Sequence, residues 1–546
     1  MASNWYKNAI IYSLDVKTFM DSNGDGQGDF RGMEHRLDYL AGLGVTCLWL
    51  HPFFPSPQKD NGYDIADYYR VDPDLGNLGS FVEFVDKAKE RGMRVLVDLV
   101  VNHTSNQHPW FLRSRRKAGS KYRSYYIWSE KKPRQSSPDT VFGEAQGGNW
   151  EYDAQAGAWY YHTFYPHQPD LNLTNPDVRE EIRWIMRFWL KLGVAGFRVD
   201  AVPHMLREKG NEKFGEDPHN LLREWREFVE EQRKDAVLLA EVDTDPKRYA
   251  DFFGDSDQMH MLFNFYLNNY LFLAFARQEA TPVINALKKL PRPPEREQYA
   301  TFLRNHDELD LERLKNKERQ EVFDAFAPEE NMRIYGRGIR RRLPPMLGND
   351  RHRLELAYSL LFSLPGAPVF RYGDEIGMGD DLRLKERNSV RTVMQWSDEE
   401  NGGFSSAPPD KLVLPAIREG EYGYPTLNVH RQMREKDSFL EWVERVISVR
   451  KECVEFGRGT WELIPSDNPA VLILCSRWKE GFSLAIHNFS ARKCDVELDT
   501  KTLSDTEIEH LIDVFGDAVY EPFHGDTKIH LNPFGYRWFR YSSFLS

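Results

Sequence analysis

Four short apolar runs in this 546-residue chain end in acidic residues, and carboxyl groups so placed can attack carbon or transfer protons. The acids are Asp98, Asp200, Glu241 and Asp307. Arg198 and Asp200 are two residues apart, so they point to the same side of an extended strand, where the arginine would lower the pKa of the carboxyl group. For that run alone a structural ion pair explains the pattern equally well. The recurrence of acids at four strand ends favours a catalytic site.

The segments between these runs indicate which elements position the acids. Apolar spacing predicts helices over 79–92 and 175–193, and a later one at about 437–451. Further strands are expected at 9–14, 45–50 and 367–372. Alternating strands and helices predict an α/β fold with a parallel sheet. In a (β/α)8 TIM barrel, catalytic groups come from the C-terminal ends of several strands, so this is the fold that we expect.

The chain is too long for a single hydrophobic core, so we expect more than one domain. Residues 104–172 interrupt the alternation with an aromatic, polar insertion, here called domain B. After residue 455, short alternating runs predict an antiparallel β-sandwich. The expected division is a barrel of 1–103 and 173–452, domain B at 104–172 and a sandwich at 455–546. Residues 311–349 are expected to form a solvated helical excursion with a basic run at 337–342.

The composition of the chain limits the kinds of molecule that it is expected to bind. The 84 acidic residues outnumber the 72 basic ones, and the net charge of −12 disfavours binding to nucleic acid or to an anionic membrane. The N-terminus has no basic region followed by an apolar run, and no stretch reaches the length of a membrane span. Four cysteines without metal spacing favour a reducing cytoplasm. We expect a cytoplasmic protein that acts on a neutral small molecule; a homo-oligomer stays open.

The loop at 21–29 reads DSNGDGQGD and alternates oxygen-bearing side chains with glycines, as a hard cation requires. A complete EF-hand loop would have Glu where this chain has Gly32. We expect a structural Ca²⁺ or Mg²⁺ site, and the alternative is a solvated polar turn. The ligands would be Asp21, Asn23, Asp25 and Asp29, with the carbonyl oxygen of Gln27.

Several segments resemble the ordered signatures of the α-amylase family, glycoside hydrolase family 13. They are DLVVNH at 98–103, GFRVDAV at 196–202, LLAEV at 238–242 and FLRNHD at 302–307, with QPDLN at 168–172 and DNGYDIADY at 60–68. The resemblance implies that Asp200 is the nucleophile, Glu241 the general acid/base and Asp307 the stabiliser of the transition state. A retaining mechanism requires the first two carboxyl groups to lie about 5–5.5 Å apart.

The same resemblance implies a set of substrate contacts. Asp60 would bind hydroxyl groups of the glucose, and the ring of Tyr63 would stack on it. Arg391 would form an ion pair with Asp60 beneath the sugar. The remaining contacts implied are Arg198, His103 and His306.

Within the family, the tract from 302 to 403 resembles the trehalose synthases, which convert maltose into trehalose by releasing and re-attaching glucose inside a closed site. Two positions differ from the pattern of the trehalose synthases. Asp243 stands where those enzymes have Asn, and an expected Arg is replaced near 139–142. Asp243 would lie at the rim of the site. We expect transfer with some hydrolysis. The alternatives are an α-glucosidase that hydrolyses or transfers to another acceptor, and a non-catalytic binding relative, against which the intact acids argue.

Overall fold

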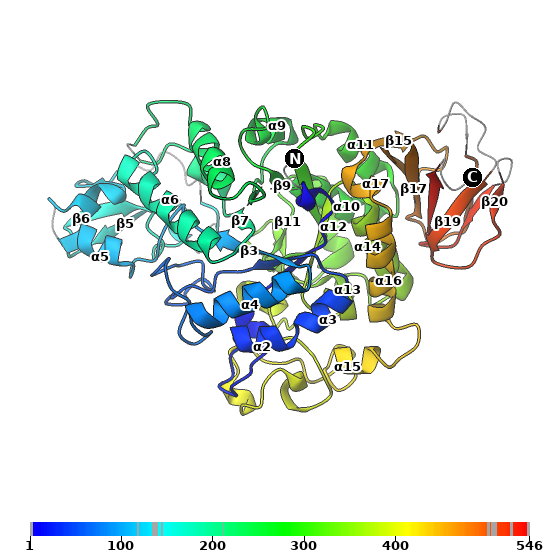
Figure 1. Ribbon diagram of the computed structural model, residues 1–546, viewed down its shortest axis with the longest axis horizontal. Coiled ribbons are helices and arrows are strands. Elements are labelled where there is room, and N and C mark those ends of the chain that lie inside the picture. The colour runs from blue at the N-terminus through cyan, green and yellow to red at the C-terminus, as the bar shows by residue number, and fades with distance from the viewer. Residues whose placement is uncertain are drawn as a thin grey trace.

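Eight parallel strands close into a barrel at the centre of the molecule (Figure 1), which confirms the predicted TIM barrel. The computed structural model describes residues 4–116, 119–133, 140–142, 146–210, 212–498, 503, 510–524 and 528–542. The barrel order is β1-β14-β10-β9-β8-β7-β3-β2. The strands are β1 (Ile11–Leu14), β2 (Cys47–Leu50), β3 (Arg94–Leu99), β7 (Gly196–Val199), β8 (Val237–Ala240), β9 (Met261–Phe263), β10 (Gln298–Phe302) and β14 (Ala367–Arg371).

Helices surround the barrel and bury the outward side chains of its strands. Asn77 caps α4 in a capping box with Ser80, and Asn175 caps α6 ahead of Pro176. Among the described residues, no helix combines the length and apolar character needed to cross a bilayer. The principal helices are α4 (Leu78–Glu90), α6 (Pro176–Lys191), α8 (Asn220–Gln232), α10 (Phe265–Arg277), α14 (Arg351–Ser363) and α16 (Phe439–Glu452); shorter ones are α1 (Val16–Phe19), α2 (Phe30–His35), α3 (Leu37–Gly42), α7 (Val202–Met205), α9 (Tyr249–Phe253), α11 (Thr281–Lys289), α13 (Leu343–Met346), α15 (Val429–Gln432) and α17 (Glu455–Arg458).

Domain B leaves the barrel after β3 and contains α5 (Pro109–Arg116) and a three-stranded antiparallel sheet of β4 (Trp128–Ser129), β6 (Ala158–Tyr161) and β5 (Trp150–Asp153). Phe111 stacks on Trp128, so some of the aromatic residues form a core of their own. Lys209, which is only 5 % exposed, ties domain B to the barrel. Its Nζ lies 2.7 Å from Asp170 Oδ2 and donates to Asn102 Oδ1 at 2.6 Å. Domain B is therefore fixed at the end of β3.

The excursion after β10 differs from the expectation of a solvated helical segment over 311–349. It contains the helix α12 (Asn316–Phe326), a 3-10 turn at 330–332 and the short α13, together with an antiparallel sheet in the order β11 (Leu309–Asp310), β13 (Gly338–Ile339), β12 (Arg333–Ile334). In the basic run, Arg342 is only 2 % exposed. Its Nη1 donates to the Tyr372 carbonyl oxygen at 3.0 Å. The expectation was wrong because the arginines are held by carbonyl and carboxylate oxygens of neighbouring segments.

The C-terminal region is antiparallel, as predicted. A six-stranded sheet runs in the order β15 (Thr460–Ile464), β16 (Val471–Trp478), β17 (Gly481–Asn488), β22 (Tyr536–Ser542), β19 (His510–Gly516), β20 (Phe523–His524), and β18 (Cys494–Val496) pairs with β21 (Ile529–Leu531). Both sheets contribute to one apolar core. Trp538 Nε1 donates to Ser359 Oγ on α14 at 3.0 Å, which joins this region to the barrel. Domain B lies on the opposite side of the barrel (Figure 1).

Candidate active site

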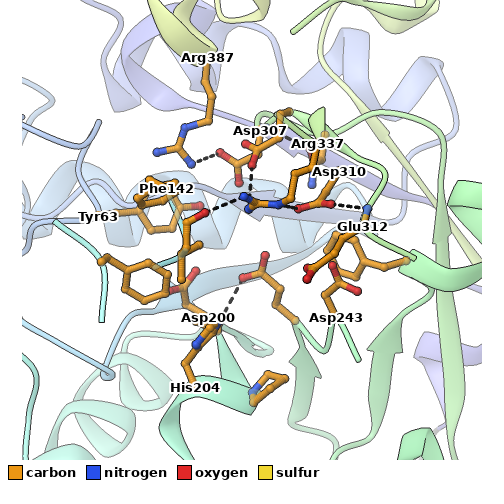
Figure 2. Close-up of a pocket in the computed structure, with 18 of the residues that line it drawn as sticks. Tyr63, Phe142, Asp200, His204, Asp243, Asp307, Asp310, Glu312, Arg337 and Arg387 are labelled. Atoms are coloured by element: carbon orange, nitrogen blue, oxygen red, sulfur yellow. Dashed lines mark hydrogen bonds and ion pairs between the residues drawn. The ribbon is translucent and has the colours of Figure 1, made fainter. Parts of the chain in front are cut away.

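A cavity of about 380 Å³ is lined by the C-terminal ends of the barrel strands, by domain B and by the excursion after β10 (Figure 2). Arg198, His306 and Arg391 are buried beside it. The structure thus gathers residues that are up to 327 positions apart in the sequence, from Asp60 to Arg387. The predicted residues that line it are Asp60, Tyr63, His103, Asp200, Glu241, Asp243 and Asp307.

One guanidinium group holds two of the predicted catalytic acids. Arg198 Nη1 donates to Asp200 Oδ1 at 2.6 Å, and its Nη2 donates to Glu241 Oε2 at 2.6 Å. Ala201 follows Asp200 with a φ of 49°, a left-handed conformation that is uncommon outside glycine. This turn brings the Ala201 N–H to Glu241 Oε2 at 3.1 Å. Gly196, with a φ of 144°, begins β7 where a Cβ would lie 2.0 Å from the Val237 carbonyl oxygen, so only glycine allows this close pairing of β7 and β8.

Burial shifts the pKa values of these two acids away from those of ordinary carboxyl groups. Burial raises the pKa of Asp200 to about 6, and Arg198 opposes that shift only in part. Arg198 lowers the pKa of Asp200, as expected, but burial outweighs this effect and the pKa is raised overall. Burial also raises the pKa of Glu241 to about 7, against the attraction of Arg198 and with the help of the charges of Asp200 and Asp307. Near neutral pH, Asp200 is mainly ionised and Glu241 retains a large protonated fraction, as a nucleophile and an acid require.

Asp307 lies opposite and is held by two arginines. Arg387 Nη1 donates to its Oδ1 at 2.7 Å, and Arg391 Nη2 donates to the same oxygen at 2.8 Å. Although burial alone would raise the pKa of Asp307, the charges of Arg387 and Arg391 hold it below its usual range. This carboxylate stays ionised throughout the neutral range, so it can accept hydrogen bonds from sugar hydroxyl groups.

The arginine beside Asp60 is Arg387, and the expected ion pair of Asp60 with Arg391 is wrong. Arg387 Nη2 donates to Asp60 Oδ1 at 2.7 Å, and Gln168 Nε2 donates to Asp60 Oδ2 at 2.9 Å. Arg391 instead donates through Nε to the His306 carbonyl oxygen at 2.8 Å. Arg387 lies in the 3-10 turn at 386–390 and Arg391 directly follows it, so the same RNSVR segment supplies both contacts. Sequence reasoning selected the wrong arginine of the two.

Tyr63 connects the strand ends beneath the cavity. Its hydroxyl donates to Asp98 Oδ2 at 2.9 Å and lies 2.7 Å from His306 Nε2. Its ring is parallel to the His306 ring at 5.5 Å, and its carbonyl oxygen lies 3.1 Å from His103 Nε2. His51, whose ring centre lies 4.1 Å from that of His306, was not predicted, because a histidine after an apolar strand carries no specific signal. These contacts fix the orientation of the ring that faces the cavity.

Asp243 lies at the rim within a cluster of charges. Arg313 Nε lies 2.9 Å from Asp243 Oδ1, and carboxylate oxygens of Asp243, Asp310 and Glu312 lie within 4.8 Å of one another. Burial and the charge of Asp310 raise the pKa of Asp243 above its usual range. The position is at the rim, as expected, but its carboxyl group is engaged with an arginine. The other departure from the trehalose synthases includes Asp139, which lies outside the described residues.

The 21–29 loop does not line the cavity. Asp21 accepts the N–H groups of Asn23, Gly24 and Gly26 at 3.0, 2.8 and 2.9 Å. Asp29 accepts the Gly32 N–H at 2.8 Å and so caps α2. A Cβ at Gly26 would lie 2.2 Å from the Lys411 carbonyl oxygen, so the tight turn requires glycine there. These residue types are the ones that bind a hard cation, but the carboxylates of the loop are not among the described acids that converge within 4.8 Å of one another.

Comparisons with known proteins point in one direction. Residues 12–328 and 338–459 match the family model "Alpha amylase, catalytic domain", and residues 482–540 match "Sucrose hydrolase-like, C-terminal domain". The trehalose synthase/amylase TreS of Mycolicibacterium smegmatis is 43 % identical over 86 % of this chain and 80 % of its own length. The trehalose synthase of Pimelobacter sp. is 40 % identical over 98 % of this chain and 96 % of its own. A structure of MutB with isomaltulose has a TM-score of 0.79, with 26 % identity and coverage of 98 % of this chain and 99 % of that one.

Proposed function

This chain belongs to the alpha-amylase family, and we propose that it interconverts maltose and trehalose by transferring a glucosyl group within one closed site. The observation that carries the proposal is the single Arg198 guanidinium, 2.6 Å from Asp200 and from Glu241, which holds together two acids that line the cavity. The names and identities of the two relatives described above support transfer. The cavity volume lies near the lower end of the range of about 300–1,000 Å³ for small-molecule sites, which suits a disaccharide.

The reaction proceeds in two displacements. Asp200 attacks the anomeric carbon of the non-reducing glucose while the bond to the glycosidic oxygen breaks, and Glu241 gives its proton to that oxygen. The result is a glucosyl ester on Asp200 and a free glucose. After the glucose has turned, Glu241 takes the proton of its anomeric hydroxyl, whose oxygen attacks the anomeric carbon of the glucosyl group; the bond from that carbon to Asp200 breaks and the carboxylate is released. Asp307 and Asp60 accept hydrogen bonds from hydroxyl groups of the transferred sugar.

Hydrolysis of small α-glucosides is the alternative, and Asp243 is the observation that favours it. When Asp243 is ionised it only accepts hydrogen bonds, whereas the amide expected by resemblance also donates at every pH. Incubation of the full chain with maltose, trehalose, sucrose or isomaltose, followed by product analysis, separates the two reactions. Trehalose from maltose, and maltose from trehalose, supports transfer. Glucose as the sole product from each substrate excludes it, and no product at all would restore the non-catalytic interpretation.

Replacing Asp243 with asparagine is expected to raise the ratio of trehalose to free glucose several-fold. The amide keeps the volume of the side chain, cannot take on the negative charge of the ionised carboxyl group and always supplies a donor to the departing sugar. Chromatography of products from maltose measures the ratio. Glu312→Gln is the matched control, because it removes a charge that also contacts Arg313, at 2.8 Å, without changing the position next to Glu241. A ratio that moves equally in both variants would show that only the charge of the cluster matters.

The 21–29 loop is proposed to hold a structural Ca²⁺ or Mg²⁺ through Asp21, Asn23, Asp25, Asp29 and the carbonyl oxygen of Gln27. The bound ion would neutralise the three carboxylates and would take no part in the reaction. This proposal is supported by the oxygen donors and by the glycine turn described above.

Thorough removal of divalent ions is expected to lower the melting temperature by a few degrees, because an ion that binds only the folded chain stabilises it. Differential scanning calorimetry with and without chelator measures the shift, and added Ca²⁺ should reverse it. Asp25→Asn should melt lower than wild type and respond less to chelator. If the wild-type curve does not move, the loop is a solvated turn.

The other expectations from composition are also proposals. The net charge of −12 supports a neutral disaccharide as partner, rather than a nucleic acid or an anionic membrane. The four cysteines without metal spacing support a cytoplasmic location, and a homo-oligomer stays open.

A further inference from the structure

Arg337 belongs to the excursion after β10, lines the cavity and reaches domain B with its side chain (Figure 2). Its Nη1 donates to the Val141 carbonyl oxygen at 2.6 Å, and its Nε donates to Asp310 Oδ2 at 2.6 Å. Glu308 Oε1 lies 3.6 Å from Nη2. We propose that Arg337 is a latch that closes domain B over the rim and keeps the released glucose inside. The proposal deepens the transfer reaction proposed above and rests on it.

The backbone fixes Arg337 to the barrel side of the cavity. Tyr335 and Gly336 have φ values of 54° and 69°, and the Arg337 N–H donates to the Ile334 carbonyl oxygen at 3.3 Å. Positive φ at both central residues is the pattern of a type I′ turn, which matches the twist of a β-hairpin. The Arg337 carbonyl oxygen accepts the Leu311 N–H at 3.1 Å. Main chain and Nε are therefore anchored to the excursion, and Nη1 alone reaches domain B among the contacts described for Arg337.

Aromatic contacts complete the junction beside this hydrogen bond. The Phe142 ring stacks on Tyr165 at 4.6 Å and lies 5.1 Å from the ring of Tyr335. The hydroxyl groups of Tyr165 and Tyr335 are 3.3 Å apart. The Arg387 guanidinium lies 5.3 Å from the Phe142 ring, so the same segment of domain B also touches the inner site. Val141 and Phe142 both line the cavity, so a shift of this segment would change the path to the solvent.

The latch matters for the fate of the glucosyl ester. While the ester waits, the released glucose must turn inside the cavity and present its anomeric hydroxyl to the same carbon. An open rim lets that glucose leave, and water or another glucose then takes the glucosyl group. Loss of Arg337 would also leave the largely buried carboxyl groups of Asp310 and Glu308 without its positive charge. Arg337 acts in this account as a positioning residue, since it works through domain B and not on the reacting atoms.

The test follows labelled glucose into disaccharide. The full chain is incubated with maltose and isotopically labelled free glucose, and mass spectrometry measures the labelled fraction of trehalose and of maltose together with the ratio of glucose to trehalose. In Arg337→Met, the labelled fraction and the glucose ratio are both expected to rise several-fold over wild type. Arg337→Lys should fall between the two, because a compact ammonium replaces the planar fork less well.

Arg333→Met is the matched control, because Arg333 lies on the same hairpin and its Nε donates to the Ala327 carbonyl oxygen at 2.7 Å, outside the cavity lining. Its products should match those of wild type. The latch proposal is wrong if Arg337→Met folds and shows the labelled fraction and the glucose ratio of wild type. It is also wrong if both quantities rise equally in Arg333→Met. If Arg337→Met does not fold, Asp310→Asn removes the other partner and decides by the same criteria. If wild type forms no trehalose, the proposed function is wrong. The entry of label into maltose would still show whether Arg337 keeps the released glucose in the cavity.

Discussion

Asparagine at position 200 is expected to reduce kcat on maltose by about 10⁴-fold or more, the scale on which loss of a catalytic nucleophile acts. The amide has nearly the same volume as the carboxyl group but cannot form the glucosyl ester. Its oxygen can still accept from Arg198, and that arginine keeps Asp98 and Glu241 as partners at 3.2 and 2.6 Å. The fold should therefore survive, so the loss belongs to the chemistry.

Three measurements on Asp200→Asn separate these effects. Steady-state kinetics gives the loss of activity, circular dichroism and the melting curve report the fold, and calorimetric titration with maltose reports binding. We expect lost turnover with retained fold and retained binding. Activity close to wild type would exclude the two-displacement mechanism, and an unfolded variant would assign Asp200 a structural role.

Glutamine at position 241 is expected to lower turnover of maltose by about 10²–10⁴-fold, the usual contribution of a general acid. A substrate with a good leaving group, such as α-glucosyl fluoride, needs no proton in the first step and should be affected much less. Because Glu241 also activates the acceptor, the glucosyl-enzyme should accumulate with that substrate, and mass spectrometry of the intact chain detects it. An equal loss on both substrates would contradict the acid role.

The pH profile gives a second measurement on the same residue. Glu241 acts first as an acid, so wild-type kcat/KM on maltose should fall as pH rises through its pKa of about 7. Asp200 must be ionised, so kcat/KM should also fall as pH drops through its pKa of about 6. The two groups interact, so the measured values belong to the pair. In Glu241→Gln with the fluoride substrate, the alkaline decrease should vanish and the acid decrease should stay.

The sequence predicted the barrel because four of its strands are apolar runs that are followed by acids. Asp200, Glu241 and Asp307 stand at strand ends, and the barrel topology brings such ends together. β9 was missed, since a strand of three residues, Met261–Phe263, carries too short a pattern. The net pKa of Asp200 was also missed, because its sign depends on how completely the fold removes water, and sequence does not measure burial.

The excursion and the arginine of the sugar pocket depended on tertiary packing. The turn at 334–337 uses Tyr335 in the left-handed region, where glycine or asparagine would have signalled a hairpin. Arg387 and Arg391 have the same side chain and lie four positions apart, so their spacing gives no reason for one to reach Asp60 and the other to reach His306. Arg337 was noticed only as part of a basic run, because its partner on domain B is a main-chain oxygen, which no motif records.

Lys209 limits how this enzyme can be recombined with its relatives. Its buried ammonium belongs to the barrel, whereas Asp170, which balances it at 2.7 Å, belongs to domain B. A buried charge that loses its partner destabilises a protein by about 3–5 kcal/mol. A chimaera that exchanges only 104–172 would put an unmatched residue opposite that ammonium unless the donor also has an acid there. Lys209 and Asn102 therefore have to be exchanged together with this segment, although both lie outside its boundaries.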